Sequence, residues 1–252
     1  MISFKEQWQD NGFFIVENLI SEELIEAYSK LWIENHGEIV DGKLSLVNPN
    51  GWEGYHTYLE HVSILEIFCG SDIPKIIEEA IGTPAGLHLN FTGWVSTRKT
   101  WHQDVTYGDK THADNYIGVW VALEDIDYRS GPFQLIPKSH KWDLDFKKLY
   151  PNPQSERASE YFAEKFLEES PPSVTFIAKK GDVIFWHGHA VHRGDLPIDE
   201  SITRKSIIGH FGSIKVGMLA QQEFLPYKHG HYFNFLPKAL LHRWQDVQHN
   251  TI

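Results

Sequence analysis

A histidine and an aspartate separated by one residue, His102 and Asp104, form the feature of this chain that most directly indicates chemistry. On an extended segment, residues two apart point to the same face, so an imidazole nitrogen and a carboxylate oxygen could reach one metal ion. Downstream, residues 181–186 read as a strand that leads into three closely spaced histidines. One of these would complete a set of two histidines and one carboxylate. Such a set leaves coordination positions open and is typical of non-haem Fe(II) oxygenases.

The residues alone leave the third ligand open among His187, His189 and His192. The first two would share one face of a continuing strand, whereas His192 follows a possible bend. A lone His-x-Asp pair also occurs by chance in many proteins, so the motif by itself is a hypothesis that needs supporting context.

That context comes from longer stretches. The chain resembles the phytanoyl-CoA dioxygenase family of Fe(II)/2-oxoglutarate oxygenases at residues 101–104, 131–140 and 181–192 and at Arg204, which follow one another in the family's order. The opening segment 12–21 is also similar to the family's N-terminal segment. The resemblance therefore covers roughly residues 5 to 215, and four motifs in order are more specific than any one of them.

The resemblance implies roles for individual residues. It assigns His102, Asp104 and His192 as the iron ligands, because the family's distal histidine lies eleven positions after the glycine that Gly181 matches. It also implies that Arg204 binds the far carboxylate of 2-oxoglutarate, since a guanidinium fork suits a carboxylate through paired charge-assisted hydrogen bonds.

Two further residues are expected beside the cosubstrate. Trp120 stands where the family carries a tryptophan, although core packing is its alternative role, and Ser206 would share a strand face with the arginine. The sequence departs from the family two positions after the distal histidine, where many members have serine or threonine and this chain has Gly194. The missing hydrogen bond would then come from elsewhere, with Thr92 and Ser96 as candidates.

The pattern along the chain predicts a β-rich core behind a helical N-terminal third. Helices are predicted at 4–10, 21–36, 59–69, 73–81, 155–169 and 236–248, and strands at 13–17, 87–97, 116–123, 133–136, 174–177, 183–186 and 206–211. The resemblance implies a double-stranded β-helix, which is a cupin-like jelly-roll barrel. We expect one domain over residues 1–252, with the barrel at about 86–215, a helical part at about 1–85 and an extension at about 216–252.

Composition narrows the classes of partner. The 252-residue chain has a formal net charge of −11 and a single cysteine, Cys69. An acidic chain lacks the basic face that general nucleic-acid binding needs, so we expect no nucleic-acid partner. One cysteine cannot form an internal disulfide and fits a reducing, cytoplasmic location. We find no signal-like segment after Met1 and no run of about 18 apolar residues, so we expect neither secretion nor a membrane span.

The family resemblance, together with the ligand motif, implies an Fe(II)- and 2-oxoglutarate-dependent dioxygenase that consumes O2, and we expect it to hydroxylate a small-molecule metabolite. Asp104 stands where related halogenases have a small residue, which favours hydroxylation, although desaturation, epoxidation and cyclisation use the same ligands. A cupin-like metal-binding barrel without oxygenase activity is disfavoured by Arg204, and a protein-interaction module is disfavoured by the complete ligand set.

The sequence does not identify the substrate or the oligomeric state. Substrate contacts are expected from loops at the barrel mouth, namely the 45–57 segment, Trp94, Tyr107, His112 and Arg193. His140 is expected to have a structural role in a turn between strands.

Overall fold

Two β-sheets face each other in the computed structural model, which describes residues 2–36, 39–40, 43–44, 57–59, 61–105, 110–149 and 157–234. The larger sheet has seven strands: β1 (Phe13–Val16), β4 (Ala85–Gly93), β5 (Tyr116–Ala122), β8 (Val183–His187), β10 (Ser206–Ser213), β11 (Phe224–Tyr227) and β12 (Gly230–Phe233). The smaller sheet has three: β6 (Phe133–Leu135), β7 (Val174–Phe176) and β9 (His192–Gly194). A separate hairpin joins β2 (Ile39–Val40) and β3 (Lys43–Leu44).

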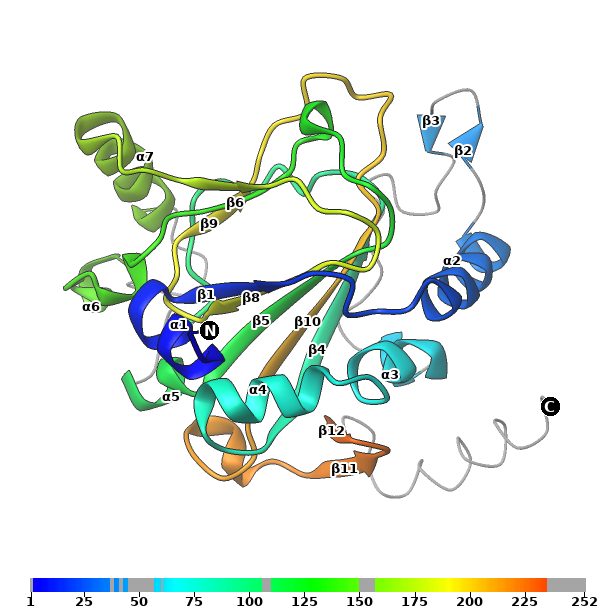
Figure 1. Cartoon of the computed structure of the whole chain (residues 1–252). Coiled ribbons are helices and arrows are strands. Elements are labelled where there is room, and N and C mark those ends of the chain that lie inside the picture. The colour runs from blue at the N-terminus through cyan, green and yellow to red at the C-terminus, as the bar shows by residue number, and fades with distance from the viewer. Residues whose placement is uncertain are drawn as a thin grey trace.

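The strand order is β1-β8-β5-β10-β4-β12-β11 in the larger sheet and β7-β6-β9 in the smaller one (Figure 1). Neighbouring strands are antiparallel, except that β12 runs parallel to β4. The expected jelly-roll class with flanking helices is confirmed, in the form of a sandwich whose larger sheet does not close into a barrel.

The helices are α1 (Phe4–Asn11), α2 (Glu22–His36), α3 (Val62–Phe68), α4 (Ile73–Ile81), α5 (Lys110–Asp114), α6 (Phe146–Leu149) and α7 (Arg157–Glu169). Short 3-10 turns lie at Thr57–Leu59, Tyr128–Ser130, Ser139–Lys141 and Met218–Gln221. No helix in these described ranges is both long and apolar enough to cross a membrane.

Local sequence explains the ends of the first helix. Ser3 and Glu6 form a capping box, in which the Ser3 side chain accepts a hydrogen bond from the Glu6 backbone and the Glu6 side chain accepts one from the Ser3 backbone. Gly12 ends the helix in the left-handed region at φ 78°, which glycine adopts without a steric penalty. The chain then enters β1 directly, so the N-terminal helix lies beside the edge of the larger sheet.

Strand β5 shows why both faces of the larger sheet are apolar. Ile117, Val119 and Val121 pack with the helices on the outer face, whereas Trp120 and Ala122 pack with the smaller sheet on the inner face. A strand buried on both faces reads as a nearly continuous apolar run rather than an alternating one. The inner space between the sheets is where the candidate site lies.

Most predicted elements are confirmed with shifts of a few residues at their ends, but two points differ. The strand predicted over 87–97 stops at Gly93, because its partner β10 begins at Ser206, the residue that pairs with Gly93. Strands β2, β3, β9, β11 and β12 and the short helices α5 and α6 were not predicted. The predicted closing helix at 236–248 and most of the 41–57 loop lie outside the described residues.

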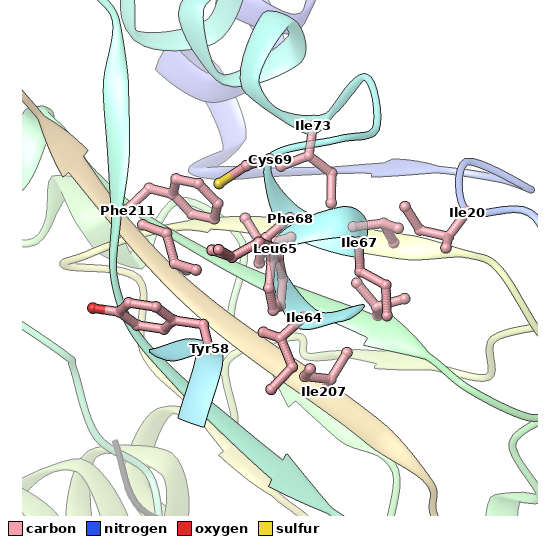
Figure 2. Close-up of a cluster of buried hydrophobic side chains, with 14 of the residues drawn as sticks. Ile20, Tyr58, Ile64, Leu65, Ile67, Phe68, Cys69, Ile73, Ile207 and Phe211 are labelled. Carbon is pink, nitrogen blue, oxygen red and sulfur yellow. The ribbon is translucent and has the colours of Figure 1, made fainter. Parts of the chain in front are cut away.

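Helix α3 packs tightly on β10. A side chain at Gly209 would meet the Phe68 ring at 2.7 Å, so glycine at this position allows the ring to lie against the strand. Figure 2 shows Phe68 within a cluster of aliphatic and aromatic side chains that includes Phe211 of the same strand. Cys69, at the end of the helix, is fully buried, and burial raises the pKa of its thiol.

We expect Phe68→Ala to lower the free energy of unfolding by about 3–5 kcal/mol, because it leaves a cavity under α3 that the rigid strand cannot fill. Denaturant unfolding measures this change. Val62→Ala on the same helix is the matched control, since Val62 is 44% exposed and should change stability by less than about 0.5 kcal/mol. Equal effects of the two substitutions would contradict the packing described here.

Candidate active site

A two-residue backbone bridge brings the His-x-Asp motif to the smaller sheet. The amide of His102 donates to the carbonyl of His192, and the amide of His192 donates to the carbonyl of His102, both at 3.0 Å. The amide of Asp104 donates to the carbonyl of Gly188 at 3.1 Å, which fixes the other end of the motif. The motif therefore lies on a loop that is attached to the start of β9, and only His102 has strand-like pairing.

The side chains of His102, Asp104 and His192 meet at one point. Their candidate ligand atoms all lie within 4.8 Å of one another, and no other such group of three is found among the described residues. The Nε2 atom of His102 is 3.7 Å from Asp104 Oδ1, and the Nε2 atom of His192 is 3.6 Å from Asp104 Oδ2. This arrangement leaves room for one ion between three donor atoms.

Both histidine rings are oriented by backbone carbonyls. His102 Nδ1 lies 2.7 Å from the carbonyl oxygen of Thr100, and His192 Nδ1 lies 2.9 Å from that of Ala190. A carbonyl oxygen only accepts, so Nδ1 carries the proton in each ring. The Nε2 lone pairs of both neutral rings are consequently free to bind a metal, as a hydrogen bond on the other ring nitrogen commonly ensures.

Burial and neighbouring charges favour the protonation states that a metal needs. Burial lowers the pKa of both His102 and His192 and keeps the rings neutral. Burial would raise the pKa of Asp104, but the neighbouring rings of His192, His210 and His102 together bring it below its ordinary value. Neutral imidazoles and an ionised carboxylate are the forms that bind a divalent ion.

Trp186 of β8 orients the carboxylate. Its indole Nε1 donates to Asp104 Oδ2 at 2.8 Å. The ring reaches this position because Gly118 on the neighbouring strand has no side chain, and a Cβ there would overlap the indole. The sequence indicated only a core strand here. The one available signal for a role at the site was the tryptophan itself, because the N–H of a buried tryptophan usually finds a hydrogen-bond partner.

We expect Trp186→Phe to weaken Fe(II) binding about 10- to 100-fold, the usual cost of losing a partner of a metal ligand. Anaerobic competition with a chelator measures this affinity. Trp94→Phe is the matched control, because Trp94 is equally buried but stacks on Trp32, with ring centroids 4.2 Å apart, and does not line the site. Unchanged affinity in Trp186→Phe would show that the indole does not position the carboxylate.

A cavity of about 540 Å³ opens beside these three residues. Trp120, Arg204 and His210 line it from the larger sheet and the segment just before β10. Each of them has a buried nitrogen without a hydrogen-bond partner in the described part of the chain: Nε1, Nε and Nδ1 respectively. Buried polar atoms are normally paired, so three unpaired donors or acceptors in one cavity indicate a site built for a polar ligand.

Arg204 is the strongest of these signals. The side chain is 1% exposed, its Nη1 donates to the carbonyl of Gly131 at 2.9 Å, and it has no carboxylate partner among the described residues. Burial lowers its pKa to about 10, which still leaves it charged at neutral pH. A buried cation without an anion is costly, so this arrangement favours an anionic ligand in the cavity.

The two other residues expected beside the cosubstrate have different surroundings. Trp120 lines the cavity. Ser206 does not line it, and its hydroxyl donates to the carbonyl of Gly93 at 3.4 Å. The role expected for Ser206 stays a prediction, without support from its position.

Sequence reasoning missed His210. Its ring is 6% exposed, and Nδ1 lies 3.7 Å from Asp104 Oδ2. The alternation along β10 could have identified it, because His210 is two residues after Ile208 and both line the cavity.

The two other candidates for the third ligand lie elsewhere. His187 packs against Trp8 and lies 3.3 Å from Asp114. Like His189, it is not part of the candidate metal group.

The residues expected to contact substrate are only partly placed. Arg193 lines the cavity, with its guanidinium 4.6 Å from the centre of the Trp101 ring and paired with Asp195 at 2.8 Å. His112 lies against Tyr116 and does not line the cavity. Residues 45–56 and Tyr107 lie outside the described residues.

Comparison with known proteins agrees with this geometry. The model of the phytanoyl-CoA dioxygenase family matches residues 80–195. The resemblance to that family is confirmed. Peroxisomal phytanoyl-CoA dioxygenase of Mus musculus is 22% identical over 231 residues, covering 82% of this chain and 66% of that protein. The Homo sapiens enzyme is 26% identical over 159 residues, covering 63% of this chain and 45% of that protein. The chain thus spans at most about two thirds of the length of these relatives.

Solved structures with the same fold include an iron-bound protein and alpha-ketoglutarate-dependent enzymes. EctD from S. alaskensis with bound Fe superposes with a TM-score of 0.64 at 14% identity, covering 83% of this chain and 75% of that one. The non-haem alpha-ketoglutarate-dependent carbocyclase SnoK from nogalamycin biosynthesis superposes with a TM-score of 0.60 at 17% identity, covering 83% of both chains. The family match and the shared fold relate the chain to dioxygenases of the Fe/2-oxoglutarate-dependent superfamily.

Proposed function

We propose that this protein is an Fe(II)- and 2-oxoglutarate-dependent oxygenase that hydroxylates an unactivated C–H bond of a small-molecule metabolite. The observation that carries the proposal is the combination, in one cavity, of three oriented metal donors with a buried arginine that has no anionic partner among the described residues. A metal-binding barrel without oxygenase activity would have no use for that arginine.

The chain's own residues divide the task. His102 and His192 would bind Fe(II) through Nε2, and Asp104 would bind it through a carboxylate oxygen while Trp186 restrains the other. Arg204 would bind the distal carboxylate of 2-oxoglutarate, with Trp120 beside the cosubstrate. When bound, iron, 2-oxoglutarate and O2 supply the oxidising chemistry and release succinate and CO2; the protein positions the C–H bond and excludes water.

Two observations support hydroxylation of a small molecule. Asp104 provides a carboxylate where a smaller side chain would leave a coordination position for halide. The cavity volume of about 540 Å³ is in the ordinary range for small-molecule sites. Proteins with this fold include EctD with 2-oxoglutarate and 5-hydroxyectoine and the epimerase SnoN with nogalamycin RO, so the fold accommodates small molecules of different shapes.

We also propose a single domain, since the two sheets together line this cavity, and a cytoplasmic location, which the single, buried and free Cys69 supports.

Purified protein with Fe(II), ascorbate, 2-oxoglutarate and O2 should form succinate slowly even without a prime substrate. Asp104→Ala should abolish succinate formation, because the substitution removes one of three metal donors. Succinate quantification checks this, and product analysis with candidate metabolites then tests whether the product has gained one oxygen atom. Wild-type protein that forms no succinate and does not bind 2-oxoglutarate in calorimetry would overturn the oxygenase proposal.

Arg204→Met should weaken 2-oxoglutarate binding by at least about 30-fold, since truncating one partner of a buried charge pair typically costs 2–5 kcal/mol. Fe(II) binding should change little, because Arg204 is not among the metal donors. Anaerobic calorimetry with metal-loaded protein measures both affinities. Equal 2-oxoglutarate affinity in wild type and variant would place the cosubstrate elsewhere.

A further inference from the structure

The hydroxyl of Thr97 occupies the position where a side chain at Gly194 would lie. A Cβ on Gly194 would meet Thr97 Oγ1 at 2.5 Å, Arg204 Nη1 at 3.1 Å and Ser96 Oγ at 3.2 Å. Thr97 belongs to the loop after β4, whereas Gly194 ends β9 on the smaller sheet. The Thr97 hydroxyl and the buried Arg204 guanidinium therefore both lie close to Gly194, and all three residues line the cavity.

Thr97 also has a hydrogen to donate. Its Oγ1 accepts a hydrogen bond from the backbone amide of Lys99 at 3.3 Å, and within the described chain its own hydrogen has no acceptor. A hydroxyl can donate one hydrogen bond while it accepts another. An ionised carboxylate only accepts, so it would be complementary to both Thr97 and Arg204.

The neighbouring hydroxyls are committed to other partners. Ser96 Oγ donates to the carbonyl of Asp195 at 2.6 Å and accepts from the amide of Arg98 at 3.2 Å. Thr92 Oγ1 lies 2.5 Å from the hydroxyl of Tyr28, on the α2 side of β4. Neither Ser96 nor Thr92 lines the cavity. The two replacements that the sequence suggested are therefore less suited to contact the cosubstrate than Thr97.

We propose that Thr97 donates a hydrogen bond to the distal carboxylate of 2-oxoglutarate beside Arg204, and that Gly194 is free of a side chain so that the Thr97 hydroxyl fits there. This inference rests on the proposed function of the site. Thr97 would then bind the cosubstrate from the loop after β4, in place of a side chain two residues after His192 on β9. Gly194 and Thr97 then form a complementary pair, in which only one of the two positions can provide the hydroxyl.

Thr97→Val removes the hydroxyl and keeps the shape, so it should weaken 2-oxoglutarate binding about 10-fold or more, as expected for a hydrogen bond to a charged group. Thr97→Ser should keep most of the affinity, because it restores the donor. Anaerobic calorimetry with Mn(II)-loaded protein measures binding without turnover. Thr83→Val is the matched control, since Thr83 bonds to Ser213 and does not line the cavity.

A second ligand, oxalate, shows which end of 2-oxoglutarate depends on Thr97. Oxalate offers the metal-binding end of a 2-oxo acid without a distal carboxylate, so Thr97→Val should leave its affinity unchanged. Gly194→Ser alone should weaken 2-oxoglutarate binding through overlap with Thr97, and Thr97→Ala combined with Gly194→Ser should recover part of that loss.

The outcomes separate this inference from the proposed function. Wild-type protein that binds no 2-oxoglutarate would overturn both. Wild-type protein that binds it, together with unchanged affinity in Thr97→Val, would overturn the role of Thr97 and leave the oxygenase proposal standing. An equal loss of oxalate and 2-oxoglutarate affinity in Thr97→Val would also overturn it, because the substitution would then act at the metal end.

Discussion

The backbone bridge between His102 and His192 is the interaction on which the candidate site depends. Its two hydrogen bonds, both 3.0 Å long, attach a loop to the first residue of β9. That attachment fixes His102 beside the third donor, and the hydrogen bond from the Asp104 amide to the Gly188 carbonyl fixes the other end of the motif. The carbonyls of Thr100 and Ala190 then orient the two rings, so backbone groups help to set the direction of both Nε2 atoms. Geometry set by the backbone costs little side-chain entropy when a metal binds.

The larger sheet has a different role at each face. Its outer face packs against the helices, where Phe68 lies on Gly209, and this packing makes the strands rigid. Its inner face carries the groups that surround the metal donors, where Trp186 passes over Gly118 to reach Asp104. Glycine is used twice for the same physical reason, which is that a large ring can approach the backbone only where no Cβ intervenes.

Charge is distributed unevenly along the cavity. Asp104 is surrounded by three imidazoles, whereas Arg204 is buried without an anion in the described chain. The buried charge of Arg204 costs free energy while it is unpaired, and an anionic ligand that neutralises it lowers that cost. A dianionic cosubstrate that bridges a divalent metal and the arginine would satisfy both ends. Ligand binding should therefore stabilise the folded chain as well as complete the site, by an amount that rises with the logarithm of ligand concentration above Kd.

Residue types and spacing in the sequence were sufficient to predict a metal-binding His-x-Asp motif, the N-terminal helices, most of the strands and a buried apolar core, because these follow from side-chain chemistry and from periods of two and 3.6 residues. They were not sufficient to choose between His187, His189 and His192, and that choice came from the family resemblance. Nor did they show that strand β4 ends at Gly93, so that the motif lies on the loop after the strand. Only the tertiary structure placed Trp186, His210 and Thr97 at the site. These residues come from separate strands and a loop, so their proximity depends on sheet register. It also depends on glycine at positions 118 and 194, where a Cβ would overlap Trp186 and Thr97. No local sequence pattern encodes such contacts.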